Sequence, residues 1–152
     1  MEIGRIVCLG AALLWVGCGS LSGGGAPPVQ LEQRENGLVY QKGHDVPYTG
    51  QLLMRVQGTR DQWVSHYKNG LRDGQFAVFY PDGKKKANAL FKAGKLVSGI
   101  TWKSDGSEGS RISNGTGTLI MYHSSGGKAR ESVYLNGERV SRQDFPPAVG
   151  DQ

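Results

Sequence analysis

Cysteine is almost absent from this chain. Its 152 residues include two cysteines, Cys8 and Cys18, and the first lies in an apolar N-terminal segment that we expect to be removed. Cleavage before Cys18 would leave one thiol, at the very end of the mature chain. The sequence therefore excludes an intrachain disulfide and a cysteine zinc cluster in the mature protein.

Long apolar runs and helical periodicity are missing as well. The longest apolar run, residues 6–16, reaches about half of the roughly 30 Å thickness of a hydrocarbon core. After Ser20, no stretch repeats apolar residues with the spacing of an amphipathic helix. The sequence thus argues against a retained transmembrane helix and against a helix bundle.

Recognisable catalytic motifs are also lacking. The three histidines, His44, His66 and His123, are far apart and have no metal-ligand spacing. The chain contains no Gly-x-Ser-x-Gly nucleophile motif and no phosphate-binding glycine loop. We therefore expect a protein that is not an enzyme, with no catalytic residue, no metal site and no cofactor.

The N-terminus has the pattern of an export signal. Arg5 precedes the apolar run, and small residues follow it. The segment Leu14-Trp15-Val16-Gly17-Cys18 resembles the bacterial lipobox, whose cysteine is acylated and becomes the mature N-terminus. This resemblance implies lipidation of Cys18 with attachment to a membrane of the bacterial envelope, and residues 19–20 favour the outer membrane. The alternative is ordinary secretion, with cleavage near residue 17 or 20.

Glycine, in contrast, is abundant, with 24 residues or roughly twice its usual share. Many glycines follow Asn or Asp, which is the strongest local signal for a hairpin turn. The segments between these pairs alternate, as at residues 76–80 and 118–122. The expected turns are Asn36-Gly37, Asn69-Gly70, Asp82-Gly83, Ala93-Gly94, Asp105-Gly106, Gly126-Gly127 and Asn136-Gly137. The pattern predicts an all-β fold.

Three carboxylates adjoin glycines of this pattern. Asp73, Asp82 and Asp105 each precede a glycine, where the Asp side chain favours a turn by bonding to nearby backbone. A pair of carboxylates can also act in general acid–base catalysis. Because a glycine follows each of the three, we predict a structural role for them.

The chain also repeats itself. Similar segments begin at Gly50, Gly74, Gly99 and Gly117, so the period is about 24 residues, and the third copy is shortened. The clearest copy, residues 73–95, contains a strand, a turn, a second strand and a second turn. Hairpins of this kind bury little surface alone and share a continuous hydrophobic layer with their neighbours.

This copy resembles the variant MORN repeat, a short glycine- and aromatic-rich β-hairpin module. The opening segments at residues 35–40 and 47–50 are similar to those of bacterial members that are often labelled YwqK-type antitoxins. The resemblance implies a single-layer array of antiparallel β-hairpins. For function, we expect a membrane-anchored protein- or envelope-interaction module; the alternative is an antitoxin or immunity-type protein that neutralises a toxin by binding it.

These observations divide the chain into four parts. We expect a signal peptide at residues 1–17, which is helical before cleavage, and a flexible tether at 18–30, rich in Gly, Ser, Ala and Pro. The β-hairpin repeats would occupy residues 31–142. A disordered tail with Pro146 and Pro147 would follow at residues 143–152.

Two features are candidate binding elements. Lys84, Lys85 and Lys86 could present positive charge to an anionic ligand, or could simply form a solvated strand edge. Phe79 and Tyr80 are adjacent and must point to opposite faces of a strand, and we choose Phe79 as the exposed aromatic. The partner would be an unknown protein or envelope polymer; export argues against nucleic acid.

Overall fold

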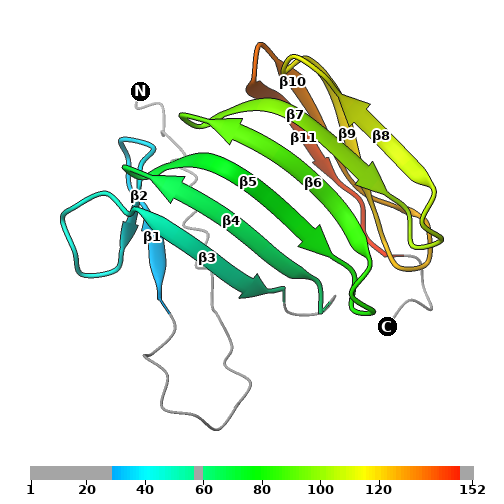
Figure 1. The fold of residues 1–152 in the computed structure, drawn as a ribbon, viewed down its shortest axis with the longest axis horizontal. Helices are drawn as coiled ribbons and strands as arrows, with labels where there is room; N and C mark the ends of the chain where they lie inside the picture. The colour runs from blue at the N-terminus through cyan, green and yellow to red at the C-terminus, as the bar shows by residue number, and fades with distance from the viewer. Residues whose placement is uncertain (1–28, 57–59, 148–152) are drawn as a thin grey trace, which may run out of the picture.

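The computed structural model describes residues 29–56 and 60–147, and within these ranges every regular element is a β-strand. Figure 1 shows the strands arranged as antiparallel hairpins in open sheets, which confirms the predicted all-β fold. No helix among the described residues is long and apolar enough to cross a membrane. The strands are β1 (Leu31–Gln33), β2 (Val39–Gln41), β3 (Gly50–Arg55), β4 (Gln62–Lys68), β5 (Leu71–Phe79), β6 (Lys85–Lys92), β7 (Lys95–Trp102), β8 (Glu108–Ile112), β9 (Gly117–Tyr122), β10 (Lys128–Leu135) and β11 (Glu138–Asp144).

The strands form three sheets in simple up-and-down order. β1 and β2 make a small hairpin, β3 to β8 follow one another in a six-stranded sheet, and β9 to β11 form a three-stranded sheet. All neighbouring strands are antiparallel. Within each sheet this order follows from connections of two to six residues, which are too short for a parallel crossover and so join adjacent antiparallel strands.

The single layer of hairpins continues through β8, and the three-stranded sheet then packs against one of its faces, which we call the inner face. β9 contacts β6, β7 and β8 (Figure 1). Close packing requires small residues opposite large ones: a Cβ at Gly99 would lie 2.8 Å from Leu119 Cδ1, and Gly109 faces the ring of Tyr122. The core consists of Ala89, Phe91, Leu96 and Ile112, with Phe76, Leu119 and Tyr134 against it. Its apolar burial is the main favourable contribution to folding.

The turns at one end of the strands are two-residue turns in which both residues have positive φ. Residues 69–70, 93–94, 114–115 and 136–137 all have this geometry. The turns stack through backbone hydrogen bonds: the Gly115 N–H donates to Val97 O, the Gly137 N–H to Gly115 O, and the Leu96 N–H to Gly137 O. We call this end the glycine end. Its turn at residues 114–115 is absent from the set expected from the sequence.

The turns at the opposite end are longer and more open. Residues 81–83 and 104–106 place only the glycine at positive φ, and a Cβ at Gly83 or Gly106 would meet nothing within 4 Å. Asp82 Oδ1 accepts from the Lys84 N–H at 3.0 Å, and Asp105 Oδ1 accepts from the Ser107 N–H at 2.8 Å. The Ser107 hydroxyl and then the Ser107 N–H lower the pKa of Asp105, and the Lys84 N–H lowers that of Asp82, which confirms the predicted turn role of both carboxyls.

The repeat is visible as a recurrent hydrogen bond. Thr49 Oγ1 accepts from the Asn69 N–H, Asp73 Oδ2 from the Ala93 N–H, and Thr116 Oγ1 from the Asn136 N–H, each spanning 20 residues. Each acceptor precedes a positive-φ glycine that begins a copy: Gly50, Gly74 and Gly117. This bond lowers the pKa of Asp73, which lies within β5 and not at a turn of its own; its predicted structural role is to accept from the turn at residues 93–94. The shortened third copy, at Gly99, has no positive φ.

The strands extend beyond the predicted limit of the repeats at residue 142. β11 ends at Asp144, which accepts hydrogen bonds from Arg142 and Arg130. The Phe145 N–H donates to Ala129 O, and Phe145 O bonds His123 Nε2 at 2.9 Å. These contacts attach residues 143–145 to the three-stranded sheet.

Candidate binding face

The face of the six-stranded sheet opposite the core, which we call the outer face, carries an uncommon set of side chains. Strand register aligns one residue from each strand in a row that crosses the whole sheet. The row runs Leu53, Val64, Ala77, Asn88, Ile100 and Arg111. Leu53 is 65% exposed, so an apolar side chain lies open to solvent at the β3 edge.

Two further rows flank this one. On one side, Gln75 pairs with Leu90 and Leu90 pairs with Ser98. On the other side, the row is made of Arg55, Gln62, Phe79 and Lys85, in this order across β3 to β6. The two cations of that row stand three strand spacings, or about 14 Å, apart. Between them lie an amide and an aromatic ring.

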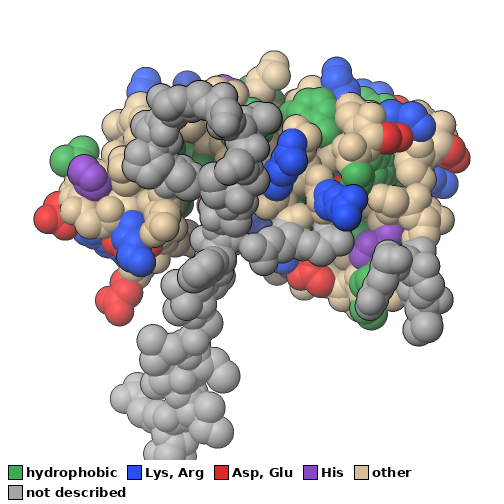
Figure 2. All heavy atoms as spheres, turned by 90° about the horizontal axis from the view of Figure 1, so that it is seen from below, with side chains coloured by type: hydrophobic (Ala, Val, Ile, Leu, Met, Phe, Trp, Pro, Cys, Tyr) green, Lys and Arg blue, Asp and Glu red, His purple; other side chains and the backbone are tan. Residues whose placement is uncertain are grey.

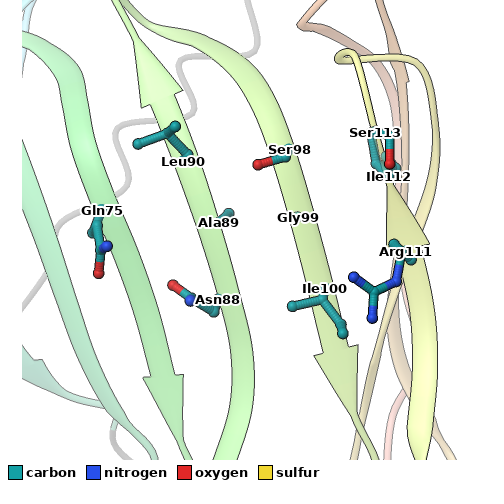
Figure 3. Close-up of a pocket in the computed structure, with 10 residues that line it drawn as sticks. All are labelled: Gln75, Asn88, Ala89, Leu90, Ser98, Gly99, Ile100, Arg111, Ile112 and Ser113. Carbon is teal, nitrogen blue, oxygen red and sulfur yellow. The ribbon is translucent and has the colours of Figure 1, made fainter.

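A shallow groove of about 320 Å³ crosses the outer face over β5 to β8. Figure 3 shows the side chains of Gln75, Asn88, Leu90 and Ile100 standing on the strands that line it. Leu90 is 42% exposed, and Asn88 is half-buried. Amide groups and aliphatic side chains therefore alternate along the groove.

The polar side chains of this face have few partners in the part of the chain that the structure describes. The amides of Gln62, Gln75 and Asn88 make no hydrogen bond there. Arg111 donates twice to Glu108, which lowers the pKa of the carboxyl and raises that of the guanidinium. Each free amide can both donate and accept, so the face presents paired hydrogen-bonding groups to solvent.

The three adjacent lysines expected to form a basic strip are not equivalent. Lys84 ion-pairs with Asp82 at 3.3 Å and donates to Ser104 O. Lys85 is exposed on the outer face opposite Phe79. Lys86 is buried, so its expected place in an exposed strip is wrong. Register shifts between Val78 and Phe79, and the resulting β-bulge turns Lys86 inward together with Ala87.

Lys86 instead completes a buried ion pair. Its Nζ lies 2.6 Å from Asp61 Oδ2, and both side chains are less than a tenth exposed. The same ammonium lies 4.9 Å from the ring centre of Tyr80. Burial, and next the Asp61 carboxylate, raise the pKa of Tyr80 to about 12, so its hydroxyl stays protonated and donates to Trp102 O. This cluster holds β6 against the chain segment that enters β4.

Phe79 lies on the outer face, as its adjacency to the buried Tyr80 predicted, but it is half-buried and not exposed. Figure 2, which views the molecule from below, shows Lys and Arg side chains in several separate groups. Cys18, the expected signal peptide and the expected tether up to residue 28 lie outside the described residues, whereas Gln30, at the end of the expected tether, accepts a hydrogen bond from the Lys42 N–H. Within residues 29–56 and 60–147, no group of three His, Cys, Asp or Glu side chains is placed to hold a metal ion.

Sequence reasoning missed most of the polar residues of the outer face. Gln62, Gln75 and Asn88 occupy ordinary alternating positions of their strands, and alternation alone assigns such positions to solvent. The available signal is that these positions carry amides instead of the Lys and Glu that usually cover an exposed sheet. Cross-strand register, which the sequence does not supply, is what brings them together.

Comparison with known proteins adds no family to this description, because no family model, curated protein or solved structure matches the chain. The variant MORN resemblance therefore stays a prediction. The hairpin geometry and the recurrent 20-residue hydrogen bond belong to this chain by direct observation.

Proposed function

We propose that this chain is a non-enzymatic lipoprotein of the bacterial envelope whose β-hairpin body binds a partner through its outer face. The observation that carries the proposal is the six-strand face with exposed Leu53 and Leu90 and unpaired amides. Leu90 borders the shallow groove, and a groove that combines apolar side chains with polar groups able to bond a partner has the composition of an interaction surface. The lipobox resemblance at Cys18 supports the anchor and the address.

The anchor would act independently of the body. Several acyl chains on Cys18 give an attachment far stronger than one chain, at about 0.8 kcal/mol per buried methylene. A tether rich in Gly, Ser, Ala and Pro would then hold the sheet away from the membrane. In this proposal, residues 1–30 determine where the protein is located, and the strands bind the partner.

Fatty-acid labelling tests the anchor. Cells that express the full chain are fed an alkyne-tagged fatty acid, and the protein is then isolated and probed for label. We expect label on the wild type and on Cys8→Ser, and none on Cys18→Ser. The Cys8 variant is the matched control because it removes the other thiol of the chain. Equal label on both variants, or none on the wild type, contradicts the proposal.

Photo-crosslinking in cells tests the face. A photoreactive residue replaces Leu90 on the outer face or Val140 on β11, which are 42% and 60% exposed. We expect a defined adduct from position 90 that is absent from position 140 and that Cys18→Ser reduces by changing the compartment. Equal adducts from both positions, or none from position 90, would refute the outer face as the interaction surface.

A further inference from the structure

The charges of the outer face are strongly unbalanced. Strands β3 to β8 contain only two carboxylates, Asp73 and Glu108. Asp73 bonds the turn that follows β6, and Glu108 is committed to Arg111. Arg55 and Lys85 are exposed on the face and form no ion pair with any described residue. A ligand that neutralises this face must therefore carry negative charge.

The uncharged groups of the face narrow the chemistry of that ligand. Gln62, Gln75 and Asn88 offer planar amides whose donor and acceptor stand side by side, which matches the hydroxyl groups of a sugar ring. Phe79 pairs with Gln62 and Leu90 pairs with Gln75, and these two side chains supply flat or aliphatic surface for the C–H groups of such a ring. Across six strands, the platform is about 24 Å wide.

An extended acidic peptide fits the face less well. Peptides that join a sheet bind by main-chain hydrogen bonds along an edge strand. Strands β5 to β7, which form most of the groove floor, have hydrogen-bonded neighbours on both sides, so this part of the groove offers side chains to a ligand and no free strand edge; β8 is the sheet edge at one end of the groove. Side-chain amides with scattered cations suit a polyhydroxylated, carboxylated chain better than a polypeptide.

We propose that the outer face is a binding site for an acidic polysaccharide, with Arg55 and Lys85 contacting carboxylates and Gln75 and Asn88 contacting ring hydroxyls. This inference rests on the proposed function and specifies the class of its ligand. The polymer lies across the strands, parallel to the rows of side chains, so that its repeating units meet successive strands in turn.

Direct binding to a defined polymer tests this assignment. The full chain, purified in detergent, is titrated with polygalacturonate, a linear uronic-acid polymer, and in parallel with neutral dextran and with polyglutamate. We expect saturable binding of polygalacturonate that weakens as salt rises, because the cations contribute through screened charge. Dextran should not bind measurably, and polyglutamate should bind more weakly.

Two double variants separate charge from shape. Arg55→Ala with Lys85→Ala should weaken polygalacturonate binding about tenfold and flatten its salt dependence. Gln75→Ala with Asn88→Ala should also weaken it about tenfold, through two lost hydrogen bonds, and leave the salt dependence unchanged. The matched control is Arg139→Ala with Gln143→Ala on exposed β11, which removes a cation and an amide away from the face and should have no effect.

The outcomes distinguish this inference from the proposed function. Equal binding of polyglutamate, with a silent amide variant, would assign the face to an acidic protein and overturn the polysaccharide. Equal loss in the β11 control would show binding by net charge alone and would overturn the site. Absence of polygalacturonate binding overturns the ligand class, whereas the position-90 crosslink in cells would still support the face as an interaction surface.

Discussion

The two ends of the hairpin array are stabilised by different interactions. At the glycine end there are four two-residue turns, and the backbone of the turn at residues 136–137 bonds both the turn at 114–115 and Leu96, so Gly115 and Gly137 have no room for a side chain. At the opposite end the turn glycines are open, and the strands are held by the buried Asp61–Lys86 pair beside Tyr80. We call this second end the ionic end.

Because of this difference, the two ends are sensitive to different kinds of substitution. Backbone bonds between turns depend on close approach and positive φ, and so the glycine end depends on the absence of a Cβ. A buried ion pair depends on two particular charges, because either one alone is costly in a low-dielectric interior. An added side chain should therefore destabilise the glycine end more, and removal of one charge should destabilise the ionic end more.

The largest effect is expected at the ionic end. Asp61→Asn keeps the size of the side chain but leaves the Lys86 ammonium buried without its counter-charge. Breaking such a pair costs about 3–5 kcal/mol of the free energy of unfolding. Urea denaturation of the purified chain measures this loss.

Two controls define the cause of that loss. Asp61→Asn with Lys86→Met removes both charges and should recover most of the stability, because a buried pair is often replaceable by apolar groups. Asp82→Asn breaks the exposed pair with Lys84 and should have a much smaller effect. If the double variant is no more stable than Asp61→Asn, the loss does not come from an unpaired charge.

A smaller effect of steric origin is expected at the glycine end. Gly115 has φ +69°, and a Cβ there would lie 2.6 Å from Leu96 O and 2.8 Å from Gly137 N. Gly115→Ala adds this backbone clash to the strain of a left-handed residue. It should lower the free energy of unfolding by about 2–4 kcal/mol. Gly106→Ala has a similar φ of +88° but open space around it. It should cost about 1 kcal/mol; equal losses in thermal unfolding would refute the crowding of the glycine end.

The sequence predicts the turns well because the turn chemistry is local. Asn69-Gly70 and Asn136-Gly137 adopt positive φ at both residues, and so does Ala93-Gly94, where alanine is unfavourable. The turn at residues 114–115 was missed because the shortened third copy breaks the period on which the repeats were aligned. All-β architecture and strand positions follow from the same local signals.

The candidate site was less predictable because it depends on relations between strands. Lys86 looks like a third exposed lysine until a bulge opposite β5 turns it inward. Gln75 and Asn88 become candidate site residues only when register places them on the face that the three-stranded sheet leaves open. Such non-local pairings leave no trace in a single sequence, since alternation fixes the period of a strand but not which face is covered.

Loss of one of the recurrent 20-residue hydrogen bonds should lower the free energy of unfolding by about 1 kcal/mol. Thr116→Val keeps the shape of the side chain and removes the oxygen that accepts from the Asn136 N–H at 3.0 Å. Thr118→Val is the matched control, because the Thr118 hydroxyl makes no hydrogen bond within the described residues. Faster hydrogen exchange at the Asn136 amide in Thr116→Val alone would confirm the bond. Identical exchange in the two variants would mean that the bond does not protect the turn.

The smallest expected effect is on the decline of Tm in acid, which depends on carboxylates at the two ends. Asp82 and Asp105 at the ionic end have pKa values lowered below 3.8 by hydrogen bonds within their own turns. Because the folded pKa is lower than the unfolded one, these carboxylates stabilise the fold above about pH 3.8, and the contribution is lost as pH falls through the lower, folded value. An asparagine oxygen accepts the same bonds at every pH, so Asp82→Asn with Asp105→Asn should flatten the decline of Tm in acid by a few degrees at most. Glu35→Gln, which removes an exposed carboxylate outside these turns, should leave the curve unchanged. If the double variant follows the wild-type curve, acid sensitivity originates elsewhere, and Asp73→Asn at the glycine end then becomes the variant that separates the two ends.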